Sequence, residues 1–348
     1  MARIFYGVQG DANGHINRSL SVAELLSGHE VLFAGGGAAA RARDAGFAFE
    51  ELPLVGMLVR DNSVQWVPTI ANFIGKRASA TRWMHRLQEI ITAFEPDLIL
   101  TDNEYFTPRA AEALGRPCYS LDHQHVLSRT RHTPPPGQTI PRLTATGIMR
   151  FFLPGLQGHL IISFHRPPLV DPHNDAIFGT VPRPDALAVQ PETGEHALMY
   201  VPGCDVDKIR NLFGRRKREY RIYGLGERPG QGNLIFRKPG RRRFLEDFAS
   251  AAYVVACGGH GLLTEALLFG KPCLLFPGRF LYEQFWNCHF VREKGFGRYY
   301  TSFVIDPKEV DAFEVSLEAC RTRIAAEDCN GRTALKAHLE SLPGMSAR

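Results

Sequence analysis

Residues 257–267 read Cys257-Gly258-Gly259-His260-Gly261-Leu262-Leu263-Thr264-Glu265-Ala266-Leu267, and they are the part of the sequence most informative about the fold. An apolar run typical of a buried strand, Tyr253–Cys257, leads into them, and a helical pattern extends from Leu262 to Phe269. Glycines at such a junction let the backbone approach a ligand closely, and the N–H groups at the start of the helix attract phosphate. These residues therefore predict a strand, a tight anion-binding loop and a helix, the unit from which parallel α/β sheets are built.

The end of this unit recurs in the first half of the chain. Residues 265–273 read EALLFGKPC, and residues 110–118 read AAEALGRPC. In both copies a helix ends at a glycine, where a left-handed C-cap is favourable, and a cation, a proline and a buried strand follow. Thirteen residues before each glycine stand Asp102 and Cys257, at the C-terminal ends of predicted strands. Because ligands of open α/β sheets bind at that edge, the repeat predicts two related domains.

Both halves of the chain alternate short apolar runs with helical patterns, which is typical of βαβ units in a parallel sheet. Residues 166–195 interrupt this alternation, because they are rich in proline and weakly periodic, as interdomain linkers are. The expected fold class is therefore α/β, with Rossmann-like domains over residues 1–184 and 185–348. The segment 311–339 is expected to be helical, and the C-terminal helix can pack back on the first domain.

The composition fits a soluble protein of this size. Of the 348 residues, 44% are hydrophobic and 22% are charged. No apolar run reaches the roughly 18–20 residues that span a bilayer, and the first eight residues are typical of a strand rather than a signal peptide. The seven cysteines form no CxxC pair, and several lie in strand-like runs. Such a pattern predicts buried thiols and a cytoplasmic location.

Basic residues gather in clusters although the net charge is only +5. One cluster covers residues 215–218, and others cover residues 237–238 and 241–243. Clusters of this kind bind phosphates, anionic lipid headgroups or nucleic acid. A solvated basic surface explains the first cluster equally well.

A second motif follows the next predicted strand. Pro277-Gly278 is followed by Glu283-Gln284 and then by Asn287. With the glycine loop, Glu265 and Gly270-Lys271-Pro272, this order resembles the GT-B glycosyltransferases, in particular the UDP-glycosyltransferases and the MurG-type enzymes. The match in order and spacing covers about thirty residues, and a weaker likeness covers nearly the whole chain. The resemblance implies two facing Rossmann-like domains with a cleft between them, the first binding an acceptor and the second a nucleotide sugar.

The resemblance also implies roles on the donor side. Glu265 would bind the ribose hydroxyls, Glu283 and Gln284 the donor sugar, and the loop with Thr264 the diphosphate. Many relatives place a phosphate-binding His where this chain has Cys257, so either His260 or the backbone alone would take over that contact. The implied donor-binding residues are Gly203, Gly259, His260, Gly261, Thr264, Glu265, Glu283 and Gln284.

No metal or cofactor is expected beyond the nucleotide sugar, which is a substrate. Asp205-Val206-Asp207 has the form of the DxD metal motif, but it lies at a predicted helix start, where Asp caps backbone N–H groups. A metal-independent reaction then relies on the helix dipole, with Arg or Lys, to stabilise the departing diphosphate.

The catalytic residues are expected near the N-terminus. The loop of residues 7–14 is rich in glycine and ends at a predicted helix that starts near His15. Histidine suits a general base because its pKa lies near neutrality. The resemblance implies that His15 is the base of an inverting transfer and that Asp102 orients it, as in other Asp–His pairs. The alternative for Asp102 is an N-cap of the helix that begins near Tyr105.

Further polar residues are expected to contact the acceptor, and Asp122 is a rival base. Residues 57–86 combine apolar side chains such as Trp66 and Phe73 with cations such as Arg82 and Arg86. This pattern suits either a lipid-facing flap at the inner face of the membrane or an ordinary amphipathic helix on the core. The expected acceptor-binding residues are Gly14, Arg18, Asp122, His123 and His125.

Three functions compete at this stage. The first is an inverting transfer from a UDP-sugar to a hydroxyl of a glycan, a lipid-linked molecule or a small molecule. The second is a sugar-nucleotide 2-epimerase of the same fold, which needs no acceptor. The third is a protein that binds or glycosylates nucleic acid through its arginine clusters, with affinity that falls steeply with salt.

Overall fold

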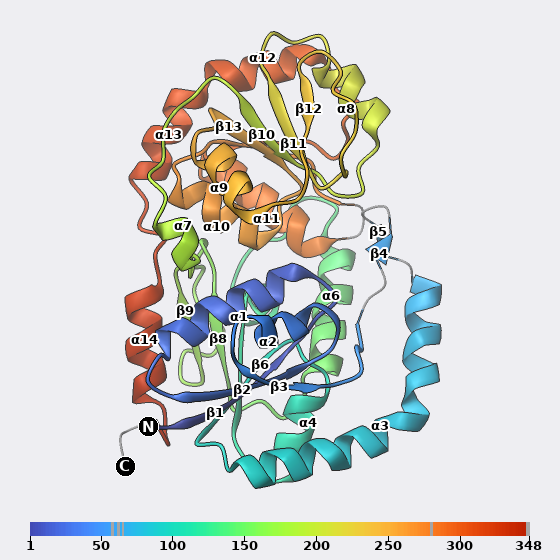
Figure 1. Ribbon diagram of the computed structural model, residues 1–348, viewed down its shortest axis with the longest axis vertical. Coiled ribbons are helices and arrows are strands. Elements are labelled where there is room, and N and C mark those ends of the chain that lie inside the picture. The colour runs from blue at the N-terminus through green and yellow to red at the C-terminus, as the bar shows by residue number, and fades with distance from the viewer. Residues whose placement is uncertain (57–58, 61–62, 65, 279–280, 346–348) are drawn as a thin grey trace. The chain divides into compact units, whose positions relative to one another are not determined.

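The computed structural model describes residues 1–56, 59–60, 63–64, 66–278 and 281–345, and over residues 59–79 only the course of the backbone. The chain divides into two compact units. Unit 1 comprises Met1–Leu58, Gln65–Arg183 and Asn330–Arg348, and unit 2 comprises Val59–Val64 and Pro184–Cys329. Figure 1 shows both units, with elements labelled where there is room.

Unit 1 is built on a seven-stranded sheet in the order β3-β2-β1-β6-β7-β8-β9. Each neighbouring pair is parallel. The order reverses direction between β1 and β6, which makes the C-terminal ends of these two strands the switch point of the sheet. The strands are β1 (Arg3–Val8), β2 (Glu30–Gly35), β3 (Ala48–Glu51), β6 (Leu98–Asp102), β7 (Cys118–Asp122), β8 (Gly158–Ile162) and β9 (Asp175–Phe178).

Helices cover both faces of this sheet, and the side chains of β1 show why. Ile4, Tyr6 and Val8 belong to one buried cluster, whereas Phe5 belongs to another on the opposite face. Alternate residues of a strand point to opposite faces, so a strand covered on both sides is apolar throughout. The helices are α1 (Asn13–Leu25), η1 (Gly37–Ala40), α2 (Arg41–Asp44), α3 (Trp66–Phe94), α4 (Phe106–Ala113), α5 (Val126–Arg129), α6 (Thr139–Phe152) and α14 (Arg332–Ser341).

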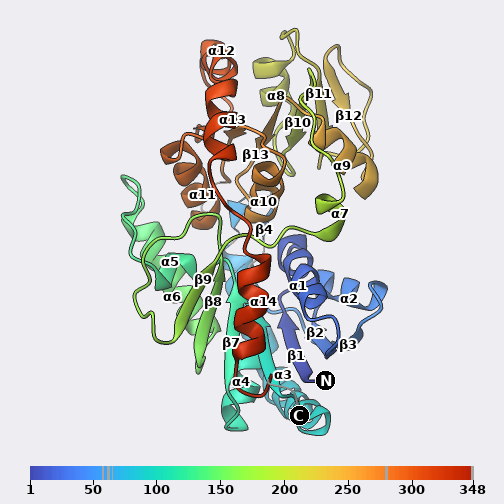
Figure 2. The ribbon, with the colours of Figure 1, turned by 90° about the vertical axis from the view of Figure 1, so that its left-hand side faces the viewer.

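The C-terminal helix α14 belongs to unit 1 although the chain reaches it only after completing unit 2. Leu335 and Leu339 are fully buried in the same cluster as Ile4 and Val22. Figure 2 shows α14 lying against the sheet, next to α1. The segment expected to be helical over residues 311–339 is therefore three helices, of which the last alone returns to unit 1.

Unit 2 repeats the plan with a six-stranded parallel sheet in the order β12-β11-β10-β13-β14-β15. Its strands are β10 (Ala197–Tyr200), β11 (Tyr220–Tyr223), β12 (Leu234–Phe236), β13 (Tyr253–Ala256), β14 (Cys273–Leu275) and β15 (Gly297–Tyr299). Its helices are α7 (Pro184–Leu187), α8 (Val206–Phe213), α9 (Arg241–Ala249), α10 (His260–Leu268), α11 (Tyr282–Glu293), α12 (Pro307–Val315) and α13 (Leu317–Ala325). A short hairpin of β4 (Val59–Arg60) and β5 (Ser63–Val64) is grouped with this unit.

The sequence repeat is a structural repeat. Helices α4 and α10 both end at a glycine with positive φ, 64° at Gly115 and 66° at Gly270. In each case the residue after the glycine donates its backbone N–H to a carbonyl in the last turn of the helix. Arg116 donates to Ala111, and Lys271 donates to Ala266. This is the Schellman C-cap, so the predicted left-handed glycines are confirmed. The two helices follow β6 and β13, which hold equivalent places in the two sheets.

The start of α10 and the proline-rich segment differ from the sequence expectation. Helix α10 begins at His260 rather than Leu262, because Gly259 is extended and the chain turns helical directly after it. The proline-rich segment 166–195 also contains ordered elements: β9 pairs with β8 and extends the sheet of unit 1, and α7 follows. Proline excludes neither, since β9 contains none and Pro184 is the first residue of α7, where proline is tolerated.

Candidate active site

The switch point of unit 1 brings His15 and Asp102 together. His15 lies in the first turn of α1, which follows β1, and Asp102 is the last residue of the neighbouring strand β6. The Nδ1 atom of His15 is 2.8 Å from Oδ1 of Asp102. The side chain of His15 is 13% exposed, whereas that of Asp102 is fully buried. The pair expected from sequence is therefore in hydrogen-bond contact.

The surroundings of His15 make its imidazole more basic than usual. Burial lowers its pKa, but the charge of Asp102 and the hydrogen bond to it outweigh burial, so the pKa lies above the ordinary 6.5. A carboxylate at Nδ1 favours the tautomer with the proton on that atom. The lone pair is then on Nε2, which lies 3.8 Å from Oδ1 of Asp11.

Arg18 has different contacts from the acceptor contacts that we expected. Its Nη2 donates to Oδ1 of Asp102 at 2.6 Å, and its Nε donates to Oδ2 at 3.0 Å. Nη2 also lies 3.3 Å from Nδ1 of His15 and 3.3 Å from Oε1 of Gln124. With its side chain only 8% exposed, Arg18 is the buried counter-ion of Asp102.

The alternative role for Asp102, an N-cap of the next helix, is taken by another residue. The carboxylate of Glu104 accepts from the backbone N–H of Phe106 at 3.0 Å and of Thr107 at 2.6 Å. Asn103, with φ of 57°, turns the chain between β6 and this cap. Glu104 thus satisfies the start of α4, and Asp102 is left to His15 and Arg18.

Asp122, the last residue of β7, and the two histidines that follow it are buried. Asp122 and His123 are fully buried, and His125 is 4% exposed. Oδ2 of Asp122 is 2.6 Å from Nδ1 of His125, and this imidazole and its charge hold the pKa of Asp122 below its usual value against the effect of burial. His123 donates from Nδ1 to the carbonyl of Ile162 at 2.9 Å. These three side chains therefore brace the end of β7 against its neighbours.

A second histidine–carboxylate pair, which the sequence did not indicate, packs against this one. The rings of His125 and His159 have centroids 4.4 Å apart, and Nδ1 of His159 is 2.7 Å from Oδ1 of Asp175. Burial, with the charge of His125 and despite Asp175, lowers the pKa of His159 to about 4. His159 is therefore neutral at physiological pH.

In unit 2 the glycine loop is held from behind by α11. Asn287, fully buried, donates its side-chain amide to the carbonyl of Gly258 at 3.0 Å. A Cβ atom on Gly258, whose φ is 83°, would lie 2.4 Å from Sγ of Cys288. Gly258 is therefore fixed by packing and by backbone conformation. Gly259 is not, because its φ is −65° and a Cβ would meet nothing within 4 Å.

The first turns of α10 carry four of the residues expected on the donor side. His260 and Gly261 form the first turn, and Gly261 is exposed whereas His260 is 6% exposed. Thr264 is 5% exposed, and within the described residues no hydrogen-bond partner reaches its hydroxyl. The N–H groups of this turn and the helix dipole make the N-terminus of α10 electropositive.

Glu265 is engaged by an arginine from the adjacent helix. Oε1 of Glu265 accepts from Nη2 of Arg241 at 2.9 Å, and Arg241 also holds Asp185 through Nε and Nη2 at 2.7 and 2.9 Å. Glu265 is 4% exposed. Arg241 follows β12 and so starts α9 at the same edge of the sheet as α10. The sequence placed Arg241 in a basic cluster but did not indicate it or Asp185 as part of the Glu265 site, because each lies far from Glu265 along the chain.

The remaining donor-side residues lie at this edge as well. Gly203 follows β10 with φ of 71°, and Gln284 in the first turn of α11 accepts from the N–H of Gly278 at 3.0 Å. Glu283 precedes Gln284 and is half-buried. The thiols of Cys204 and Cys257 lie 3.9 Å apart beside Gly203.

Asp205 caps a helix, as its position predicts. Its side chain accepts from the N–H of Asp207 at 2.9 Å, and Asp207 pairs with Arg210 one turn later. Over the residues that the structure describes, no cluster of three His, Cys, Asp or Glu side chains is placed to hold a metal ion.

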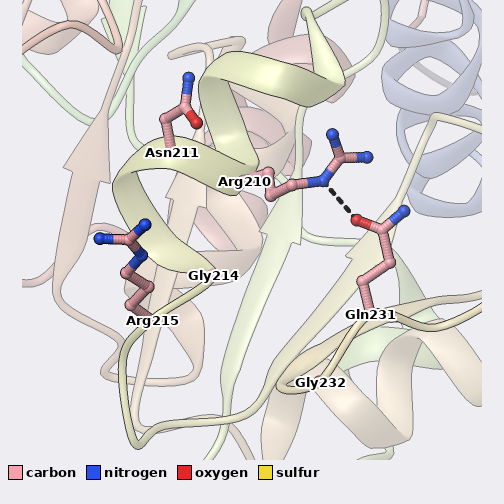
Figure 3. A pocket seen from close by; sticks show the side chains of 6 residues that line it. All are labelled: Arg210, Asn211, Gly214, Arg215, Gln231 and Gly232. Atoms are coloured by element: carbon pink, nitrogen blue, oxygen red, sulfur yellow. Dashed lines mark hydrogen bonds between the residues drawn. The ribbon is translucent and has the colours of Figure 1, made fainter.

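The basic clusters are largely neutralised by carboxylates. Arg216 pairs with Asp311, Arg218 with Glu314 at 2.9 Å, and Arg242 with Glu246 at 2.9 Å. A hollow of about 550 Å³ at the C-terminal end of α8 is lined by Arg210, Asn211, Gly214, Arg215, Gln231 and Gly232. Figure 3 shows Arg210 turned toward Gln231, with which it is hydrogen-bonded. Helix α8 begins at the same edge of the sheet as α10 and runs toward the other edge. The hollow at its C-terminal end therefore lies away from the start of α10.

Residues 66–86 of the segment with the predicted lipid-facing flap belong to the long helix α3. The side chains of Trp66 and Phe73 are not among those that the structure describes. Nη2 of Arg86 lies 3.6 Å from Oε2 of Glu50 in an exposed ion pair. Among the described residues, none of the helices combines the length and the apolar character that crossing a bilayer requires.

Comparison with known proteins identifies the family of this chain. Residues 2–318 match the family model described as glycosyl transferase family 1. A protein of Methanosarcina acetivorans described as an uncharacterized glycosyltransferase is 24% identical over 346 residues, covering 85% of each chain.

Solved structures of similar fold include two glycosyltransferases. The glycotransferase of kitacinnamycin has a TM-score of 0.69 at 17% identity, covering 97% of this chain and 98% of that one. The glycosyltransferase VinC, in complex with dTDP, has a TM-score of 0.61 at 16% identity, covering 97% and 98%. The chain therefore belongs to glycosyl transferase family 1 and is a glycosyltransferase with the GT-B fold, as the sequence motifs predicted.

Proposed function

We propose that this glycosyltransferase moves a sugar from a nucleoside-diphosphate sugar to a hydroxyl group, with inversion at the anomeric carbon. Unit 1 binds the acceptor, and unit 2 binds the donor. The observation that carries the proposal is the contact of 2.8 Å between His15 and the buried Asp102 at the switch point of the first sheet. It supplies a general base of the kind that direct displacement by a hydroxyl needs.

In this mechanism Nε2 of His15 accepts the proton of the acceptor hydroxyl as its oxygen attacks the anomeric carbon. The proton on Nδ1 stays between His15 and Asp102, whose charge stabilises the imidazolium that forms. Attack on the face opposite to the leaving group inverts the configuration. The bond to the diphosphate breaks in the same step, and the nucleotide leaves with both electrons of that bond.

The departing diphosphate is stabilised by the N-terminus of α10. The backbone N–H groups at Gly259–Gly261 and the unmatched hydroxyl of Thr264 are the donors that we assign to it. Glu265 binds the ribose hydroxyls, and Arg241 holds that carboxylate in place. Glu283 and Gln284 are assigned to the donor sugar.

The nucleotide is expected to carry a pyrimidine base. The likeness to UDP-glycosyltransferases favours UDP, and VinC, which has the same fold, is a complex with dTDP. Acceptors with a glycan, lipid-linked or small-molecule hydroxyl all suit this mechanism. The nucleic-acid hypothesis is weakened by the ion pairs of Arg216, Arg218 and Arg242, which leave less positive charge for phosphates.

The proposal is tested by incubating the protein with a panel of UDP- and dTDP-sugars and hydroxyl acceptors, with and without a metal chelator. We expect transfer that survives the chelator and a product whose anomeric configuration, measured by NMR, is opposite to that of the donor. His15→Ala should lower the rate by about 10²–10⁴-fold. Interconversion of donor sugars without any acceptor would instead identify the epimerase, and retention of configuration would exclude His15 as the base of a direct displacement.

A further inference from the structure

Asp102 is a buried carboxylate with two basic neighbours, Arg18 and His15. Its side chain has no exposed surface, and both oxygens are engaged by Arg18, at 2.6 Å on Oδ1 and 3.0 Å on Oδ2. The hydroxyl of Ser19 also donates to Oδ2, at 3.2 Å. His15 contacts Oδ1 alone. A buried carboxylate strongly favours a positive partner, because burial of an unpaired charge is unfavourable.

The fork of Arg18 fixes the orientation of the carboxylate. A guanidinium that binds both oxygens holds the carboxylate in its own plane, which a single hydrogen bond does not do. Oδ1 is thereby directed at Nδ1 of His15. Arg18 and Ser19 lie one turn beyond His15 on α1, so the same helix positions the base and the group that aligns its carboxylate.

The charge of Arg18 also acts on His15 directly. Nη2 lies 3.3 Å from Nδ1 of His15, so the guanidinium opposes a positive charge on the imidazole. Without Arg18, the cation nearest to Asp102 would be His15 itself, and the carboxylate would keep that imidazole protonated. A protonated His15 has no lone pair with which to accept the acceptor's proton. The groups that act on this cluster are Asp11, Asp102 and Arg18 at His15, and Tyr6 and Asp122 at Arg18.

We propose that Arg18 is a positioning residue of the transfer reaction, which aligns Asp102 with His15 and keeps the imidazole neutral enough to act as a base. The inference rests on the proposed function. It replaces the acceptor contact that the sequence suggested for Arg18. Gln124, whose side-chain oxygen is 3.3 Å from Nη2, links this arginine to the loop after β7.

The test compares four forms of the full-length protein: wild type, Arg18→Met, Arg18→Lys and Ser19→Ala. The titration of His15 is followed by NMR on histidine-labelled protein without substrate, with the signal assigned by His15→Gln. In Arg18→Met the midpoint should rise by about one pH unit or more, because a neighbouring positive charge is lost. Ser19→Ala removes an uncharged donor from the same carboxylate and should leave the midpoint unchanged.

Activity gives a second readout. The acid limb of the kcat/KM profile should move upward with the midpoint in Arg18→Met. In Arg18→Lys, which keeps the charge but not the fork, the limb should stay near that of the wild type while kcat falls. If Arg18→Met does not fold, Arg18→Gln takes its place.

Folded charge-removing variants whose His15 midpoint equals or falls below that of the wild type would overturn the proposal. Since the NMR titration needs no substrate, this outcome is distinct from failure of the proposed function, which would appear as absence of transfer by the wild type.

Discussion

The buried carboxylates of Asp102 and Glu265 are each held by an arginine that also holds a further group. Arg18 bridges Asp102 and Gln124, and Arg241 bridges Glu265 and Asp185. Because charge-assisted bonds of this kind are directional, both carboxylates are fixed before any substrate arrives. Preorganisation of this kind is what a site needs to act on developing charge.

The pH dependence of the reaction follows from His15. Its pKa lies above 6.5 because Asp102 outweighs burial, so the imidazole loses its lone pair as the pH falls through that value. We expect kcat/KM to decline on the acid side with a midpoint above 6.5. In Asp102→Asn the main opposition to burial is removed, so the acid limb should move to lower pH while kcat falls. An acid limb at the same pH in both proteins would show that another group controls it.

Gly259 offers a residue-level test of the phosphate site. The Cβ atom added by Gly259→Ala has no atom within 4 Å, and the φ of −65° at this position suits any residue. The free energy of unfolding should therefore change by less than about 0.5 kcal/mol. If the diphosphate lies against the start of α10, the added methyl group should weaken nucleotide binding about tenfold or more, measured by calorimetry. Unchanged affinity in the folded variant would place the diphosphate elsewhere.

The sequence indicated some of these residues and their contacts but not others. It predicted the contact between His15 and Asp102, and it singled out Glu265 from the motif that follows a strand. It did not identify Arg241 as the partner of Glu265, and it did not indicate the contact of Arg18 with Asp102. Spacing within one motif gives no information about partners 84 residues apart, such as Arg18 and Asp102, and the pairing of His15 with Asp102 was implied by the family resemblance instead.

At the scale of elements, the two halves share one way of ending a helix. Gly115 after α4 and Gly270 after α10 have φ near 65°, and a methyl group added to either would have no atom within 4 Å. The glycines therefore serve backbone conformation and not packing. The sequence predicted these ends correctly because a glycine followed by a cation and proline is a local signal. It misplaced the start of α10, which follows directly after the extended Gly259.

Both glycines should respond alike to substitution. Gly115→Ala and Gly270→Ala place a Cβ in the left-handed region, so each should lower the free energy of unfolding by about 1–2 kcal/mol. Gly147→Ala, inside α6 and equally uncrowded, should be neutral or stabilising by up to about 1 kcal/mol. Urea unfolding measures all three. Equal effects at the three positions would contradict the distinction by conformation.

At the scale of the whole molecule, two α/β units of related topology are built from one chain that returns to its first unit. The parallel sheets were predictable from the alternation of strands and helices. The sequence indicated only that α14 can pack on the first unit, because the pattern of an amphipathic helix does not specify which of two sheets the helix covers. Leu335 and Leu339, fully buried in unit 1, answer that question in the structure.

Truncating a buried side chain of α14 should therefore lower the stability of unit 1 and not that of unit 2. Leu339→Ala should destabilise that unit by about 2–5 kcal/mol, through lost burial and a cavity. Hydrogen exchange measured by mass spectrometry should show faster exchange in β1 and α1 and unchanged exchange in β13 and α10. Val315→Ala, at a position 88% exposed on α12, is the matched control and should change neither. Loss of protection in unit 2 alone would contradict the assignment of α14.

Binding of the donor nucleotide to unit 2 at α10 is the step on which the proposed function depends, and calorimetric titration of UDP, dTDP, GDP and ADP measures it. The titrations use wild type, Glu265→Ala, and Glu246→Ala as a control for loss of a surface carboxylate. Arg241 keeps Asp185 as a partner in Glu265→Ala, so this variant should fold. We predict selective binding of a pyrimidine nucleotide that Glu265→Ala weakens at least tenfold and Glu246→Ala leaves unchanged. Failure of the wild type to bind any of the four nucleotides, or equal affinity in all three proteins, would contradict a donor site at α10.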